Sequence, residues 1–158
     1  MNPLYSDVTA KKLFKTMRII HLALLAGQVL FAGVVFFLNH STVISLDTSE
    51  ILVIVAPVMG VAAFVGSIVF FENQLQSVKD RATLKEKMGA YQTALIVRFA
   101  LLESASLFNL VCYFITQNFL FLLIAMLMII YFVVATPTIN SAESDLELNY
   151  DEKSELEQ

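Results

Sequence analysis

The sequence predicts an all-α fold: an integral membrane four-helix bundle made of two transmembrane hairpins. The first observation is composition, because 58% of the 158 residues are hydrophobic, only 15% are charged, and the mean hydropathy is +0.73. Soluble domains average roughly 45–50% apolar and 25% charged residues. The second observation is a set of four apolar stretches, each close to the roughly 20 residues that a helix needs to cross a hydrocarbon core. These stretches cover residues 19–38, 51–71, 91–114 and 119–135.

The chain before the first stretch, residues 1–17, is expected to form a cytoplasmic interfacial segment. Leu13, Phe14 and Met17 share one side of a helix there, while lysines occupy the other side. The first stretch is longer than the apolar core of a signal peptide, and bulky residues close it where a cleavage site would need small ones. We therefore expect a retained helix, the first of a transmembrane domain over residues 18–136.

The second and fourth stretches differ in the size of their side chains. Small residues recur four apart in the second stretch, and such pairs let helix backbones approach closely. We expect this helix to pack against its neighbours through Ala56, Gly60, Ala63 and Gly66. The fourth stretch is bulky throughout, with Tyr131 as its polar residue, so we expect it to face lipid.

The C-terminal tail, residues 137–158, carries seven acidic residues against one lysine. Pro137 helps to end the preceding helix, because proline has no backbone N–H to donate. A segment with so much charge and so few apolar residues cannot bury a core of its own. We expect an acidic, disordered cytoplasmic tail.

The distribution of Lys and Arg, the third observation, predicts the topology. Eight of the ten basic residues lie before the first stretch or between the second and third, and none lies in the other two loops. Positively charged loops remain on the cytoplasmic side. We expect a bacterial inner-membrane protein with both termini and the central loop in the cytoplasm.

An internal repeat connects the first and third stretches. A shift of 77 residues aligns residues 19–39 with 96–116, with identities such as Leu24/Leu101, Leu30/Leu107 and Phe37/Phe114. The pattern indicates a duplicated hairpin, in which both repeats keep the same orientation in the membrane. Glu103 aligns with Ala26, so the carboxyl group belongs to the second half alone.

Glu103 is the main candidate for a functional residue, because it lies in the middle of the third stretch. A carboxylate near the bilayer centre costs at least about 2.5–3.5 kcal/mol, so an acidic residue there indicates a functional site. Desolvation favours its neutral form unless a cation compensates. Gln28 lies at a similar depth in the first stretch and is the expected hydrogen-bond partner. Two interpretations stay open: a structural hydrogen bond between helices, or the handling of an ion or proton.

Other polar residues of the third stretch fall on two faces of a helix. At about 100° per residue, Gln92 and Ser106 share a face with Glu103, whereas Arg98 and Asn109 lie on another. Gln92, Arg98 and Asn109 are expected to support the site, although Arg98 can also extend to the cytoplasmic surface. His21 is expected near a membrane interface, too far from His40 to share a metal with it.

Residues 56–115 resemble the helical hairpin of the rotary ATPase proteolipid, the c subunit. A helix with small residues is followed by a polar loop and by a helix that carries Phe99-Ala100-Leu101-Leu102-Glu103-Ser104, similar to the proteolipid stretch around its ion-binding carboxylate. The loop differs, because Asp80-Arg81 stands without the Arg-Gln-Pro of the proteolipids. The resemblance implies that Glu103 binds a proton or a cation such as sodium, with Ser104 as a further ligand.

The sequence therefore favours a small membrane protein that is not an enzyme. No zinc, serine-hydrolase, phosphate-loop or nucleic-acid motif is present, and the lone Cys112 rules out chemistry through a pair of cysteines. We expect an ion- or proton-binding oligomer or small transporter centred on Glu103, with Ser104, Gln28 and Ser106 as further candidates for the site. The alternative is a structural or accessory subunit of a larger membrane complex. Lipid and a second copy or another membrane subunit are the expected partners, and no cofactor is implied beyond a proton or sodium ion.

Overall fold

The computed structural model describes residues 3–40, 42–79, 83–150 and 152–153, and over these residues the chain consists of helices joined by loops, with no strand. The predicted all-α class is therefore confirmed. The helices in chain order are α1 (Pro3–Asn39), α2 (Ile51–Lys79), α3 (Leu84–Thr116), α4 (Phe119–Val134) and α5 (Ile139–Asp145).

The two-residue turn between α3 and α4 is fixed by its own side chains and dihedral angles. Gln117 ends α3 in the left-handed region, with φ 55°, and its N–H bonds the carbonyl of Tyr113. Asn118 then caps α4, because its side-chain oxygen accepts from the N–H of Leu120 at 3.1 Å. The same amide side chain bonds both backbone groups of Ser45, which fastens the loop after α1 to this turn.

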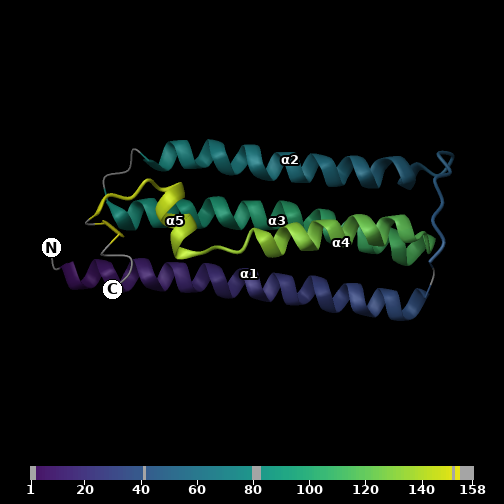
Figure 1. Ribbon diagram of the computed structural model, residues 1–158, viewed down its shortest axis with the longest axis horizontal. Coiled ribbons are helices and arrows are strands. Elements are labelled where there is room, and N and C mark those ends of the chain that lie inside the picture. Colours follow the sequence, from purple (N-terminus) through teal and green to yellow (C-terminus); the bar gives the residue numbers. More distant parts are fainter. Residues whose placement is uncertain (1–2, 41, 80–82, 151, 154–158) are drawn as a thin grey trace.

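Four of the helices lie side by side along the long axis of the molecule, with α1 and α2 at opposite edges and α3 and α4 between them (Figure 1). α3 contacts each of the other three long helices, so it is the centre of the bundle. α1 and α3 run in the same direction (Figure 1), and Gln28 contacts Ser106, 78 residues further along the chain. The two helices that align in the internal repeat, α1 and α3, are thus neighbours in space. The 78-residue separation of this contact is close to the 77-residue shift of the repeat.

The buried apolar residues form two clusters along the bundle. One lies toward the end where the termini meet and joins Phe14 and Met17 of α1 to Phe71, Met88 and Tyr91 of α2 and α3. The other surrounds Tyr113, Phe121 and Ala125 near the opposite end. Outside these clusters the bundle exposes large apolar side chains along α1 to α4, including Leu30, Phe37, Val61, Ile115 and Leu127.

Three helical segments are long and apolar enough to cross a membrane: Lys12–Asn39, Ile51–Val78 and Leu84–Thr116. α4 has 16 residues and meets the same test only together with α5, from which it is bent by 83°. The sequence predicted four spans, whereas the structure supports three by length and composition, or four if the bent pair counts as one.

α4 packs into the bundle, although its bulky sequence predicted contact with lipid. Phe121, Ala125 and Phe132 are completely buried, while Leu127 and Ile130 on the other side of the helix are exposed. A helix that is apolar all round gives no sequence signal for the side it buries. The prediction of a lipid-facing α4 is therefore wrong for the face that packs into the bundle, and for the exposed face it stays a prediction.

The described part of the acidic tail folds back onto the bundle, where composition predicted disorder. Ala142, Leu146 and Leu148 are buried in the cluster near the termini. Two polar contacts fasten the tail to α3: Tyr91 donates to Asp145 at 2.9 Å, and Lys87 pairs with Glu152 at 2.8 Å. The bundle supplies the apolar surface that the tail itself lacks.

Candidate functional site

Glu103 lies on α3 and is half-buried at the edge of the bundle. Its backbone carbonyl accepts a hydrogen bond from the Ser106 hydroxyl at 2.9 Å. Its carboxyl group has no hydrogen bond or ion pair with any residue that the structure describes. A strongly polar group in an apolar segment is thus left without a partner from its own chain.

Gln28 does not bond to Glu103 as predicted, because its partner is Ser106. The two side chains are completely buried between α1 and α3, and the Ser106 Oγ lies 2.6 Å from the Gln28 Oε1. The Gln28 Nε2 has no partner among the described residues. The expected hydrogen bond between the first and third helices therefore exists, with Ser106 in the place predicted for Glu103.

Ser104, predicted as a ligand beside Glu103, is exposed, and its hydroxyl donates to the carbonyl of Leu101 at 2.9 Å. Asn109 is completely buried and donates to the carbonyl of Ala105 at 2.9 Å. Gln92 is half-buried about three turns from Glu103 on the same helix. The predicted site residues are therefore not gathered around one point.

Arg98 binds inside the bundle instead of extending to the surface. Its Nη2 donates to the Tyr131 hydroxyl of α4 at 2.9 Å. The guanidinium carbon lies 4.7 Å from the centre of the Phe71 ring of α2, within the range of a cation–π contact. The guanidinium group of Arg98 therefore connects α3 with α2 and α4. Its contacts are structural and lie apart from the Glu103 carboxyl.

His21 connects α1 with α4 and the residues after it, a contact that the sequence did not predict. It is completely buried, its ring stacks on Phe132 at 4.4 Å, and its Nε2 lies 3.0 Å from the Thr136 hydroxyl. The sequence placed this residue near an interface because it stands at one end of an apolar stretch. A better signal was its spacing of four residues from Met17 and seven from Gln28, which puts all three on one helical face.

The packing residues predicted on α2 behave differently from one another. Ala56 is completely buried and Ala63 half-buried. A Cβ atom on Gly60 would lie 3.2 Å from the Met128 side chain of α4, whereas one on Gly66 would meet nothing within 4 Å. Close approach of α2 to another helix is therefore required at Gly60 and not at Gly66.

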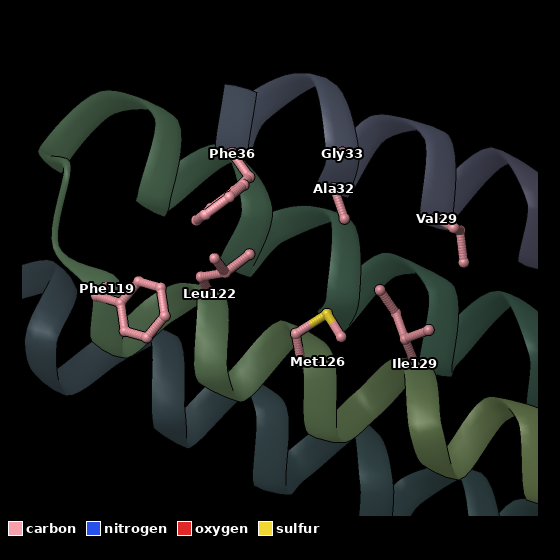
Figure 2. Close-up of a pocket in the computed structure, with 8 residues that line it drawn as sticks. All are labelled: Val29, Ala32, Gly33, Phe36, Phe119, Leu122, Met126 and Ile129. Atoms are coloured by element: carbon pink, nitrogen blue, oxygen red, sulfur yellow. The ribbon is translucent and has the colours of Figure 1, made fainter. Parts of the chain in front are cut away.

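A groove of about 420 Å³ runs between α1 and α4 (Figure 2). Its lining is apolar throughout: Val29, Ala32, Gly33, Phe36, Phe119, Leu122, Met126 and Ile129. A groove without a polar side chain fits hydrocarbon and offers nothing to hold an ion or a polar substrate. Among the described residues, no group of three or more His, Cys, Asp or Glu side chains is placed to hold a metal ion.

Over the described residues, the fold and these contacts define an all-helical chain with three helices apolar and long enough for a membrane, and with the partly buried carboxyl group of Glu103 on one of them. No protein-family model, no curated protein and no solved structure matches the chain.

Proposed function

We propose that this chain is a four-span protein of the bacterial inner membrane that works by associating with protein in the same membrane, as a subunit of a homo-oligomer or larger complex, without enzymatic activity. The observation that carries the proposal is the carboxyl group of Glu103, half-exposed on an apolar helix and without a partner in the described chain. A group of this kind is stabilised when a neighbouring chain supplies a hydrogen bond.

The energetic argument rests on the cost of an unpaired polar group in hydrocarbon. Insertion of a carboxyl group at the centre of a helix costs about 2.5–3.5 kcal/mol. A hydrogen bond between transmembrane helices returns about 0.6 kcal/mol on average and up to about 2 kcal/mol. Association therefore offsets part of a penalty that the isolated chain must bear in full.

The membrane location has separate support. Three helices are long and apolar enough to span, and many large apolar side chains are exposed along the bundle. An apolar surface of that extent is a liability in water and an advantage in lipid. The Lys and Arg distribution supports cytoplasmic termini.

A second candidate function is binding or transfer of a proton or a cation such as sodium at Glu103. It is favoured by one specific fact: the group is an ionisable carboxyl, where an amide would serve as well for a hydrogen bond. Gln28 bonds Ser106 and the Ser104 hydroxyl donates to Leu101, so we propose that a neighbouring chain supplies further ligands of such a site.

Two substitutions of Glu103 separate the candidates. Glu103→Gln keeps the shape and the hydrogen-bonding capacity, whereas Glu103→Leu removes both. If association is the function, we expect native mass in lipid nanodiscs to be kept by Glu103→Gln and reduced by Glu103→Leu, with no proton or sodium flux in liposomes of any variant.

Flux in wild-type liposomes that Glu103→Gln abolishes, with assembly intact, would establish the ion-handling function instead. A protein that remains a monomer in nanodiscs and is recovered from native membranes without any partner would contradict the proposal of association.

A further inference from the structure

The outward side of α3 differs from the rest of the exposed apolar surface. It carries Ala100, Glu103, Ser104 and Leu107, which we name the α3 outward face; Ala100 and Ser104 are exposed and the other two half-exposed. The aligned positions of α1, Ala23, Ala26 and Gly27, are also exposed and small but carry no polar group, and elsewhere α1 and α2 expose large apolar residues such as Leu30 and Val61. The α3 outward face therefore combines small size with polar groups, the composition found where membrane helices associate.

The four residues have a definite order around the helix. At 100° per residue, Ser104 lies about 40° to one side of Ala100 and Glu103 about 60° to the other side, with Leu107 close to Ala100. Ala100 and Leu107 thus form a central line, and the carboxyl and hydroxyl groups flank it at almost the same height.

Two copies of this chain must enter the membrane in the same orientation, because the basic residues are gathered at one end. A two-fold axis between them then runs along the membrane normal, and equal residue numbers lie at equal depth. Under this symmetry, the side of the helix that carries Glu103 on one copy faces the side that carries Ser104 on the other copy. Glu103 meets Ser104 of the second copy, only about 1.5 Å apart in height.

We propose that a second copy of this chain docks on the α3 outward face, with two reciprocal hydrogen bonds between Glu103 of each copy and Ser104 of the other. The proposal rests on the proposed function, association in the membrane, and names its partner and contact. Within the part of the chain that the structure describes the site is incomplete, because no described residue donates to the Glu103 carboxyl or accepts from it.

The hydrogen bonds are consistent in their donors and acceptors. Ser104 already donates its hydroxyl hydrogen to the carbonyl of Leu101, so its oxygen lone pairs remain free to accept. A neutral Glu103 has an O–H to donate, and the apolar surroundings favour this neutral form. Each copy therefore gives one hydrogen and accepts one, and no proton needs to be gained or lost.

Close approach of the two helices is allowed beside Ala100 and Ser104. Ala100 and Ser104 are four residues apart and small, so the backbones can come near enough for both hydrogen bonds. The groove between α1 and α4 is lined by apolar side chains alone, so on a second copy it could not form a hydrogen bond with Glu103.

The test measures dimer dissociation in lipid nanodiscs or mixed micelles for three variants and a control. Glu103→Leu and Ser104→Ala each remove both reciprocal bonds, so we expect each to weaken the dimer by about five- to tenfold. The double variant should be no weaker than either single variant, because the same bonds are already lost. Ser77→Ala is the matched control, since Ser77 is an exposed serine of α2 that also donates to the carbonyl three residues back.

Disulfide formation locates the contact without relying on stability. In a Cys112→Ala background, cysteine at Ala100 should cross-link two copies in membranes, whereas cysteine at Val61, exposed on α2, should not. A dimer that cross-links only through other faces, or that Ser104→Ala leaves unchanged, would overturn this inference while leaving association in place. A chain with no self-association would overturn this inference, and only a chain without any membrane partner would also remove the proposed function.

Discussion

Two glycines of α2 show how much a single residue depends on its neighbour. Both belong to pairs of small residues with the same sequence spacing, yet only Gly60 faces the Met128 and Ile124 side chains of α4. Leucine at Gly60 must displace those side chains, so we expect Gly60→Leu to lower the free energy of unfolding by about 1–3 kcal/mol. Gly66→Leu should change it by less than about 0.5 kcal/mol, because nothing lies within 4 Å.

Thermal unfolding in the same detergent measures both variants. Equal loss of stability in the two would mean that α2 packs against something at Gly66 as well, contrary to the arrangement of the helices in this structure.

Sequence patterns located the polar residues but not their partners. Depth along an apolar stretch correctly paired the first helix with the third, and the pair is Gln28 with Ser106. Glu103 and Ser106 are three residues apart, and which of them meets Gln28 depends on the rotation and height of the helices, which composition does not specify. The hydrogen bond from Arg98 to Tyr131 was not predicted for the same reason. α4 is apolar on nearly every side, so its sequence does not show which way Tyr131 faces.

At the scale of elements, α5 packs on the bundle through two apolar residues and a capping box, which the acidic composition of the whole tail does not reveal. Ala142 and Leu146 stand four residues apart, which places them on one helical face toward the bundle. A capping box between Thr138 and Ser141 begins the helix, and Pro137 lies before it. The positions of the four long helices were otherwise predicted, because a long apolar run bounded by polar residues is a strong signal. Their ends were not: α2 continues to Lys79 and α3 begins at Leu84, beyond the predicted stretches 51–71 and 91–114.

The pair of Glu152 with Lys87 predicts a pH-dependent tail. Burial raises the pKa of Glu152, but hydrogen bonds from Lys87 and the backbone N–H of Asn149 outweigh it, so the pKa lies below its ordinary value of 4.5. A lowered pKa means that the pairing stabilises the docked tail above pH 4.5 and is lost as the pH falls through the lowered value. The protection factors of the α5 amides, which correct for the pH dependence of intrinsic exchange, should therefore be high at neutral pH and lower in acid.

Glu152→Gln should mimic the acid state, raising exchange in α5 by about two- to fivefold at neutral pH. Glu143→Gln is the control, because Glu143 pairs at 3.6 Å with the more exposed Lys153 and should have a smaller effect. Exchange that is fast at every pH in the unaltered chain would show that the tail is not docked in solution.

At the scale of the whole molecule, the fold places the start of α1 and the α5 segment toward one end of the bundle and the α3–α4 turn at the opposite end (Figure 1). This arrangement agrees with an even number of spans and with basic residues at one end only. α4 is short for a membrane span, because its 16 residues rise about 24 Å against a hydrocarbon core of about 30 Å. The residues after it, from Ala135 to Pro137, extend its reach before α5 turns away by 83°.

Labelling of cysteines decides between three and four spans. In a Cys112→Ala background, cysteine at Gln117, exposed in the α3–α4 turn, should react with an impermeant maleimide in intact cells. Cysteines at Ser77 and Ser144, exposed near the end of α2 and in α5, should react only after the membrane is opened. Reaction of Ser144→Cys in intact cells, with Ser77→Cys still protected, would leave α1, α2 and α3 as the only spans. The tail would then lie outside, where Lys87 could not hold Glu152 as it does in this structure.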